Sequence, residues 1–406
     1  MKLINTSTIH PFTNLHRNYP RLLSEMEKPV VSAIIPCLNE EETLGICINK
    51  IKQTFESLNI NGEIVVGDNG STDRSVEIAE SLGAVVAHQP IKGYGAAIQA
   101  AVKKASSDWL IMADADDSYD WTNLKPFLDE LEKGSDLVMG NRFQGTIHPG
   151  AMPFLHKYVG NPFLTRISQL LYKIKVGDFH CGMRGFTREA WNKMHLMSPG
   201  MEFATEMVIR ASEEKLAISE IPIDLHPDKR SRPPHLQTFR DGWRHLRFIM
   251  TYAPNYLYLI PGLLMVFIGL IFQIVLFNGP VTIYGQYIGI HFLALGLMIF
   301  FLGLSVTTMG ITARVYLVNK SRLRTDPVTH WVNNHFYLEK ILLSALLLFI
   351  AGLAIDISIL FRWLEGSDSM ETSIHYAFIA SSMIVTSIHL SFSSFFLDMF
   401  RKKDHE

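Results

Sequence analysis

The chain has 406 residues, of which 48% are hydrophobic and 19% charged, and its net charge at pH 7 is -2. The apolar content excludes intrinsic disorder, and the near-neutral balance argues against a nucleic-acid binder, which would need an excess of basic residues. The spacing of the three cysteines, Cys37, Cys47 and Cys181, predicts neither a disulfide framework nor a zinc site, and we expect reduced thiols in a cytosol-facing domain.

Short strands and helices alternate through the first half of the chain. Residues 1–28 mix charged residues, proline and asparagine without the apolar segment of a signal peptide, and we interpret them as a leader. Strands are expected at 30–35, 63–66, 84–87, 109–113 and 136–140, and helices at 40–58, 73–82, 95–105 and 121–133. Asn39 is expected to cap the first helix. The alternation predicts an α/β domain over 29–227 with a doubly wound, mostly parallel sheet. Ligands bind such sheets at the carboxyl ends of the strands.

A basic segment, residues 228–255, follows this domain. It holds six Lys or Arg residues between 229 and 247, and basic residues near a membrane attract anionic headgroups. Arg240, Arg244 and Arg247 have helical spacing, which predicts an interfacial helix together with Trp243 and Phe248.

Four membrane spans are predicted in residues 256–398. No Asp, Glu, Lys or Arg occurs from 256 to 313, and a spanning helix needs about 20 apolar residues. The spans are expected at 256–277, 287–313, 341–361 and 376–397, followed by a basic tail at 399–406. Basic residues lie before the first span, between the second and third, and after the fourth. The positive-inside rule therefore predicts a multi-pass protein of the cell membrane with its N-terminal domain in the cytoplasm. Asp356 in the third span is expected to take part in helix packing or to lie at the membrane interface.

Three polar motifs follow predicted strands or precede a helix. Asp114-Ala115-Asp116 ends a strand, and two carboxylates there suit a hard cation bound to a substrate diphosphate, although a solvated turn would have the same pattern. The segment 68–73 is a turn with a helix cap, in which Asp68 could also accept nucleoside hydrogens. Residues 92–95 are Gly-rich and precede a helix whose N-terminus could neighbour a diphosphate.

Five motifs in chain order resemble the inverting family-two glycosyltransferases of GT-A fold. They are Pro36-Cys37-Leu38-Asn39-Glu40, Asp68-Asn69-Gly70-Ser71-Thr72-Asp73, Lys92-Gly93-Tyr94-Gly95, Asp114-Ala115-Asp116 and Gly140-Asn141-Arg142-Phe143. The resemblance covers 29–247 by motif. A basic segment followed by membrane helices is similar to the polyprenyl-phosphate members of that family, which include dolichyl-phosphate mannose and glucose synthases.

The resemblance implies roles for the matched residues. The donor-binding set would be Pro36, Asn39, Glu40, Asp68, Gly93, Asp114 and Ala115. Asp114 and Asp116 would hold Mg²⁺ or Mn²⁺, and Asp116 and Asp178 would be catalytic. The acceptor phosphate would meet Arg142, Lys157, Arg230 and Arg232. For Asp178, a structural carboxylate paired with Arg184 is the alternative.

The chain departs from the family pattern at Asn69, which replaces an acid, at Gln99, which replaces an Asn, and in the basic loop at 226–235, which leaves open which arginine meets phosphate. The Gln-x-x-Arg-Trp motif of processive synthases is absent, which implies transfer of a single sugar.

The implied donor is UDP-glucose, a UDP-N-acetylhexosamine or GDP-mannose, and the implied acceptor is a polyprenyl or dolichyl phosphate. Membrane lipids are also expected as partners, and nucleic acid is not. Whether the protein forms a homo-oligomer is left open. The alternatives are transfer to another lipid, or a non-catalytic scaffold for glycan assembly, which would be expected to lose Asp68, Asp114 or Asp116.

Overall fold

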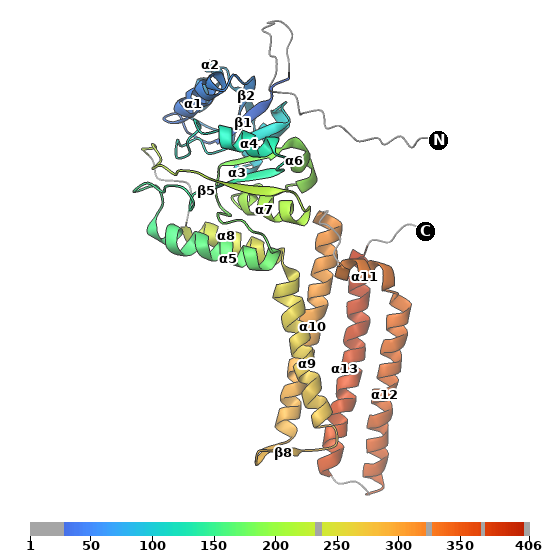
Figure 1. Cartoon of the computed structure of the whole chain (residues 1–406). Helices are drawn as coiled ribbons and strands as arrows, with labels where there is room; N and C mark the ends of the chain where they lie inside the picture. Colours follow the sequence, from blue (N-terminus) through green and yellow to red (C-terminus); the bar gives the residue numbers. More distant parts are fainter. Residues whose placement is uncertain (1–27, 232–237, 322–326, 367–369, 402–406) are drawn as a thin grey trace, which may run out of the picture.

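The computed structural model describes residues 28–231, 238–321, 327–366 and 370–401. It consists of an α/β domain and a group of four long helices (Figure 1). Arg232, nearly all of the leader and the end of the tail lie outside the described residues.

A seven-stranded sheet forms the centre of the α/β domain. Its order is β3-β2-β1-β4-β6-β5-β7. The strands are β1 (Val31–Cys37), β2 (Gly62–Asp68), β3 (Val85–His88), β4 (Trp109–Met112), β5 (Leu137–Asn141), β6 (Arg184–Thr187) and β7 (Ile218–Pro222). All pairs are parallel except those that β6 makes with β4 and β5. The predicted mostly parallel sheet is therefore confirmed, and the antiparallel β6 brings the residues before it to the end of β4.

Helices pack on the sheet and join its strands. They are α1 (Leu44–Ser57), α2 (Ser75–Ser81), α3 (Tyr94–Lys104), α4 (Lys125–Glu132), α5 (Asn161–Tyr172), α6 (Arg188–Met194), α7 (Phe203–Glu213) and α8 (Thr238–Thr251). Two predicted helix starts were wrong. Asn39 has a φ of 58° and lies outside α1, whose N-cap residue is Thr43. The fourth helix begins at Lys125, because the stretch before it places Trp121 in the core.

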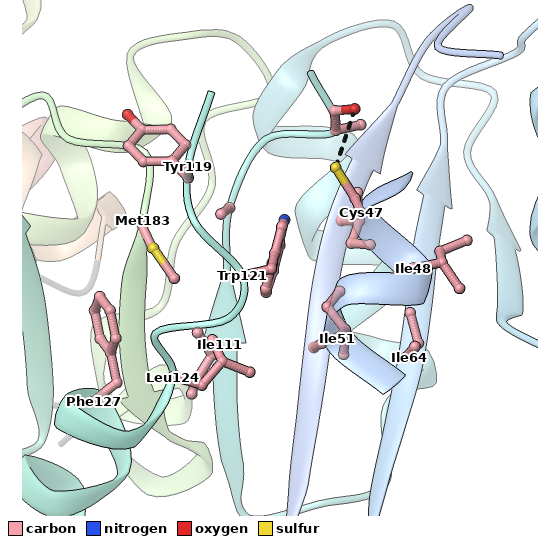
Figure 2. Packing of buried hydrophobic residues seen from close by; sticks show 14 of the residues in the cluster. Cys47, Ile48, Ile51, Ile64, Ile111, Tyr119, Trp121, Leu124, Phe127 and Met183 are labelled. Carbon is pink, nitrogen blue, oxygen red and sulfur yellow. Dashed lines mark hydrogen bonds between the residues drawn. The ribbon is translucent and has the colours of Figure 1, made fainter. Parts of the chain in front are cut away.

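The apolar core on one side of the sheet holds the loop after β4 in place. Figure 2 shows Trp121 between Ile111 and Leu124 on one side and Cys47 and Ile51 of α1 on the other. Trp121 has no exposed surface, and a buried tryptophan is among the larger single contributions to a core. The three cysteines are buried and unpaired with one another, as predicted.

The C-terminal part contains four helices long and apolar enough to span a membrane, at Asn255–Val275, Ile290–Asn319, Leu338–Leu364 and Ser373–Phe400. They belong to η2 (Asn255–Leu259) with α9 (Ile260–Val275), α10 (Ile290–Ser321), α12 (Leu338–Leu364) and α13 (Met370–Phe400). The prediction of four long apolar helices in this part of the chain is confirmed. The second begins at 290 rather than 287, because β8 (Val281–Ile283) and β9 (Gln286–Ile288) form a hairpin before it. A short helix, α11 (Pro327–His335), precedes α12.

Glycines bring α9 and α10 into backbone contact at several levels. A Cβ added to Gly269 would lie 2.6 Å from the carbonyl oxygen of Gly296, and one added to Gly303 would lie 2.5 Å from the amide nitrogen of Val266. Small residues at such positions let membrane helices approach closely. The Ser382 hydroxyl donates to Gln273 Oε1 at 2.8 Å and so joins α13 to α9.

Candidate functional site

Polar side chains fasten together the loops that follow β1 and β2. The Asn39 side-chain oxygen accepts the Thr72 N–H at 2.7 Å, and the Asn39 N–H donates to Ser71 Oγ at 3.0 Å. The Asp68 carboxylate accepts the N–H groups of Gly70 and Ser71. Burial would raise the pKa of Asp68, but hydrogen bonds, chiefly those from Ser71, outweigh it and hold that pKa below its usual value. The loops thus present an ionised carboxylate at the end of β2.

Asn69 occupies the position where the family usually has an acid, and its contacts explain the difference. Its amide nitrogen donates to the carbonyl oxygens of Gln89 and Ile91, at 3.2 and 2.7 Å. Its side-chain oxygen accepts the Gly93 N–H at 2.6 Å. A carboxylate could accept the last bond but could not donate the other two. The amide therefore joins the β2 and β3 loops to the start of α3.

We expect Asn69→Asp to lower the free energy of unfolding by about 3 kcal/mol, because it leaves two carbonyl groups without their donor and adds a buried charge. The midpoint of thermal unfolding of the full-length protein in detergent measures this. Asn123→Asp, the same change at an exposed position, is the control and should stay within about 0.5 kcal/mol of the wild type. Equal midpoints for the two variants would contradict this role of Asn69.

Asp114 and Asp116 follow β4 at the carboxyl edge of the sheet. Burial and the charge of Asp116 raise the pKa of Asp114 to about 7, and a Tyr94 hydrogen bond opposes the shift. Asp116 Oδ1 accepts the N–H and hydroxyl of Ser118, at 3.1 and 2.6 Å. A side chain at Gly182 would meet Asp114, since its Cβ would lie 2.8 Å from Oδ2. The two carboxylates are thus close enough to repel each other, which favours a cation between them.

Arg230 bridges the ends of β1 and β4 across the site. Its guanidinium lies 3.2 Å from Glu40 Oε1 and 2.9 Å from Asp116 Oδ2. It also contacts Asp228 at 2.9 Å. The predicted donor residue Glu40 and the predicted metal ligand Asp116 are therefore within reach of one side chain. A positive charge stands against Asp116 before any substrate is bound.

Contacts of Asp117 and Ala115 hold the loop after β4 in position. Asp117 has a φ of 58° and pairs with Lys50 at 2.6 Å and Lys229 at 2.7 Å. The Cys47 thiol donates to the carbonyl oxygen of Ala115 at 3.5 Å (Figure 2). These contacts position the loop, and the Ala115 carbonyl faces α1.

Asp178 and Arg142 form a buried, bidentate ion pair. Arg142 Nε lies 2.6 Å from Oδ2 of Asp178 and Nη2 lies 2.8 Å from Oδ1, and the Arg142 N–H also donates to the carboxylate. Asp178 has no exposed surface. The alternative pairing of Asp178 with Arg184 is wrong, because Arg184 donates instead to the carbonyl oxygens of Cys181, Ala204 and Phe179.

Glu220 on β7 supports this ion pair and was not predicted from the sequence. Its Oε1 accepts the N–H groups of Gly177 and Asp178 and the side-chain amide of Asn141. It therefore links the segment before Asp178 to the end of β5, next to Arg142. No local motif marks Glu220, and only its alignment beside β5 brings it here.

Two N–H groups at the start of α3 donate to the neighbouring chain around residue 200. Gly95 and Ala96 donate to the carbonyl oxygens of Gly200 and Pro199. A Cβ on Gly93 would lie 2.1 Å from the Pro199 oxygen, so packing alone explains that glycine. These two N–H groups are used within the fold, and the expectation that this helix N-terminus neighbours a diphosphate stays a prediction.

Exposed apolar and basic side chains gather on α5 and α8. Figure 1 shows these helices next to each other on the side of the α/β domain that faces the long helices. α8 was the predicted interfacial helix, and α5 with the turn η1 (His156–Gly160) was not predicted. The exposed apolar and basic residues of the two helices, of the turn and of the two positions before it are Phe154, Leu155, Tyr158, Val159, Phe163, Arg166, Leu170, Phe239, Arg240, Trp243, Arg244 and Arg247. We call them the membrane-facing surface.

Lys157 lies in η1, at the edge of the membrane-facing surface. Its Nζ is 5.5 Å from the ring centre of Tyr158. Burial, and secondly the charge of Arg142, lower the pKa of the preceding His156. This segment is thus within electrostatic range of Arg142, and two of the four predicted phosphate-binding residues, Arg142 and Lys157, lie in one region.

Comparison with known proteins gives matches at both ends of the chain. The family Glycosyl transferase family 2 matches residues 32–194, and the Glycosyltransferase family 2 C-terminal transmembrane region matches residues 311–401. The Low-salt glycan biosynthesis hexosyltransferase Agl6 of Haloferax volcanii is 36% identical over 389 residues, which cover 95% of this chain and 93% of that protein. Glycosyltransferase AglJ and a Dolichyl-phosphate hexose transferase of the same organism are each 32% identical, over 52% and 48% of this chain and 68% and 81% of theirs. The chain belongs to glycosyltransferase family 2 and is a membrane glycosyltransferase.

Proposed function

We propose that the protein transfers one sugar from a nucleotide sugar to the phosphate of a polyprenyl or dolichyl phosphate at the cytoplasmic membrane face, with inversion. The observation that carries this proposal is the convergence of Glu40, Asp68, Asp114 and Asp116 at the carboxyl ends of β1, β2 and β4, in a domain joined to four membrane helices. In an α/β sheet this edge is where ligands bind.

The residues present fit a divalent cation at Asp114 and Asp116. Among the described residues no group of three or more His, Cys, Asp or Glu side chains forms a closed metal cage. Mg²⁺ is commonly held by one or two carboxylates together with substrate phosphates, so an incomplete protein cage suits a cation that arrives with the donor. A cation there would neutralise charge on the diphosphate leaving group. The Arg230 contact with Asp116 shows that this carboxylate attracts positive charge.

The chain's own residues then position the two substrates. Asn39, Glu40 and Asp68 would hold the nucleoside, Pro36 in buried β1 would support the pocket, and Ala115 and Gly93 would shape it through their backbone. A lipid phosphate is already anionic near neutral pH, so the acceptor needs orientation more than deprotonation. Arg142, fixed by Asp178, would supply that orientation, and Lys157 and Arg230 would add charge. Asp178 therefore acts as a positioning residue, because Arg142 engages both of its oxygens.

The membrane-facing surface supports a lipid acceptor. Tryptophan and basic residues favour the interface between headgroups and acyl chains. A related protein carries the name Dolichyl-phosphate hexose transferase, which agrees with this acceptor class. Basic residues next to the spans support a cytoplasmic catalytic domain. Transfer to another membrane lipid is the second candidate, because the same surface would receive it.

A transfer assay with radiolabelled donors tests the proposal. Full-length protein in detergent would receive undecaprenyl or dolichyl phosphate, Mn²⁺ or Mg²⁺, and UDP-glucose, UDP-N-acetylglucosamine or GDP-mannose in turn. We expect one donor to give a lipid-extractable product that is lost with EDTA. A product formed only with a diacylglycerol or a glycolipid would establish the second candidate. No turnover and no nucleotide binding would favour a non-catalytic scaffold.

A further inference from the structure

A cavity lies where the catalytic domain meets the first two membrane helices, away from the carboxylate site. Its volume is about 330 Å³, roughly eleven times the 30 Å³ or so that a water molecule takes in the liquid. Its walls come from the ends of α5 and α7, from the chain between α8 and η2, and from α10, which meet in the middle of Figure 1. The residues that matter here are Tyr172, Lys173, Glu213, Tyr252, Asn255 and Arg314.

The cavity lies near the ends of the membrane helices, at the level that lipid headgroups occupy. Asn255 is the first residue of the first span, and Arg314 lies five residues before the end of the second, which is about 7.5 Å along a helix. An arginine this close to the end of a span reaches the headgroup region with its charged group. Tyr172 and Tyr252 add the amphipathic rings that favour the same layer.

The charges of the lining suit an anion. Lys173 and Arg314 are cationic, and Glu213 is the acidic residue among those that line the cavity. The Glu213 carboxylate already lies 3.9 Å from Nη1 of Arg210, whose guanidinium is 5.8 Å from the ring centre of Tyr252. Arg210 also lies 4.0 Å from Glu206 and is thus shared by two carboxylates. Together with Lys173 and Arg314, three cations stand against two carboxylates, so this group of side chains keeps a net positive charge.

The wall of the cavity also contains a hydrogen-bond acceptor, just beneath its surface. The side-chain oxygen Oδ1 of Asn255 is buried and has no hydrogen-bond partner within the described part of the protein. A buried polar atom without a partner costs about 1–3 kcal/mol, so a ligand that donates to it gains affinity. Phosphate oxygens cannot donate, whereas a hydroxyl group beside the phosphate can.

We propose that this cavity binds the headgroup of an anionic phospholipid that carries a hydroxyl group, as phosphatidylglycerol does. Lys173 and Arg314 hold the phosphate diester, and Asn255 accepts a hydrogen bond from the headgroup hydroxyl. The bound lipid connects α5 of the catalytic domain to α10 of the membrane part. This site is separate from the sugar-transfer site and does not depend on the proposed donor or acceptor.

Native mass spectrometry of the full-length protein in detergent tests the proposal, with no nucleotide sugar or polyprenyl phosphate present. Titration with dioleoylphosphatidylglycerol should show one lipid bound more tightly than the rest. Arg314→Gln and Lys173→Asn should each weaken it about tenfold or more, as expected for a lost charged hydrogen bond. Asparagine is chosen for Lys173 because its φ of 55° is a left-handed conformation that asparagine tolerates.

Matched controls separate this site from general attraction to charged lipids. Arg166→Gln, at an exposed position of α5 outside the cavity, should leave the tight lipid in place. Dioleoylphosphatidylmethanol has the same charge without the hydroxyl group and should bind more weakly, and phosphatidylcholine weaker still. Equal losses in Arg166→Gln and Arg314→Gln would overturn the proposal. So would displacement of the lipid by millimolar inorganic phosphate, which would identify a free-phosphate site. If Arg314→Gln without lipid unfolds at a lower temperature than the wild type, the lipid affinity of Lys173→Asn is used in its place to decide the test.

Discussion

Asp116→Asn should reduce the initial rate of sugar transfer about 1,000-fold while the protein stays folded. The asparagine keeps the shape and can still accept the hydrogen bonds of Ser118, but it removes the negative charge that a cation on the diphosphate needs. The loss corresponds to roughly 4 kcal/mol of transition-state stabilisation. The radiolabelled transfer assay measures it, and Asp120→Asn in the same loop is the control, expected to stay within about twofold because its carboxylate bonds only locally to Thr122.

A companion variant distinguishes the cation from the ion pair that Asp116 makes with Arg230. If Asp116 served only to hold Arg230 and its segment, Arg230→Gln would lose as much activity as Asp116→Asn. We expect instead that Arg230→Gln loses only about tenfold, the effect of one charged hydrogen bond. It should keep the metal requirement of the wild type, because both carboxylates remain. Equal losses in the two variants would contradict the assignment, and so would a residual activity of Asp116→Asn that requires Mn²⁺ at the same concentration as the wild type.

Asp178→Asn should cost about 3–5 kcal/mol of stability, because it leaves the Arg142 guanidinium buried without its counter-charge. It should also lower kcat/KM for the acceptor lipid by at least about 100-fold, since a displaced Arg142 no longer orients the phosphate. Thermal unfolding and steady-state kinetics at varied acceptor concentration measure the two effects.

The pH dependence of the rate separates positioning from base catalysis. If Asp178 were the general base, Asp178→Asn would abolish the acidic limb of the profile, whereas Arg142→Lys would retain it. If Asp178 only positions Arg142, both variants should keep the limb of the wild type at a lower rate. If the acidic limb of the pH profile were lost in Asp178→Asn but kept in Arg142→Lys, Asp178 would be identified as the general base.

The strands and spans could be predicted because each carries its own signal. β1, β2 and β4 are short apolar runs closed by polar turns, and the long apolar stretches fix the membrane helices regardless of the rest of the fold. Prediction was poorer where tertiary contacts decide the local structure. Asn39 looks like a helix cap, but its side chain bonds to the β2 loop. The stretch from 121 has helical spacing, but burial of Trp121 delays the helix.

Partners within the site could not be predicted for a related reason. Asp178 and Arg142 are 36 residues apart in the sequence, and Arg230 is 190 residues from Glu40. No spacing rule connects such pairs. The antiparallel insertion of β6 between β4 and β5 creates the first, and the return of the chain from β7 across the sheet edge creates the second. The sequence therefore indicated which residue types would meet but not which of them would pair.

Because of the glycine contacts between α9 and α10, the catalytic domain is attached to the membrane helices by a rigid connection and not by a flexible linker. The close backbone contacts at Gly269 and Gly303 leave little room for the two helices to move relative to each other. α9 is joined to α8 through η2, and η2 also packs on α10. In the proposed reaction, the distance between the carboxylate site and the membrane surface is therefore set by these helices. The acceptor phosphate then has to move from the membrane surface to the site.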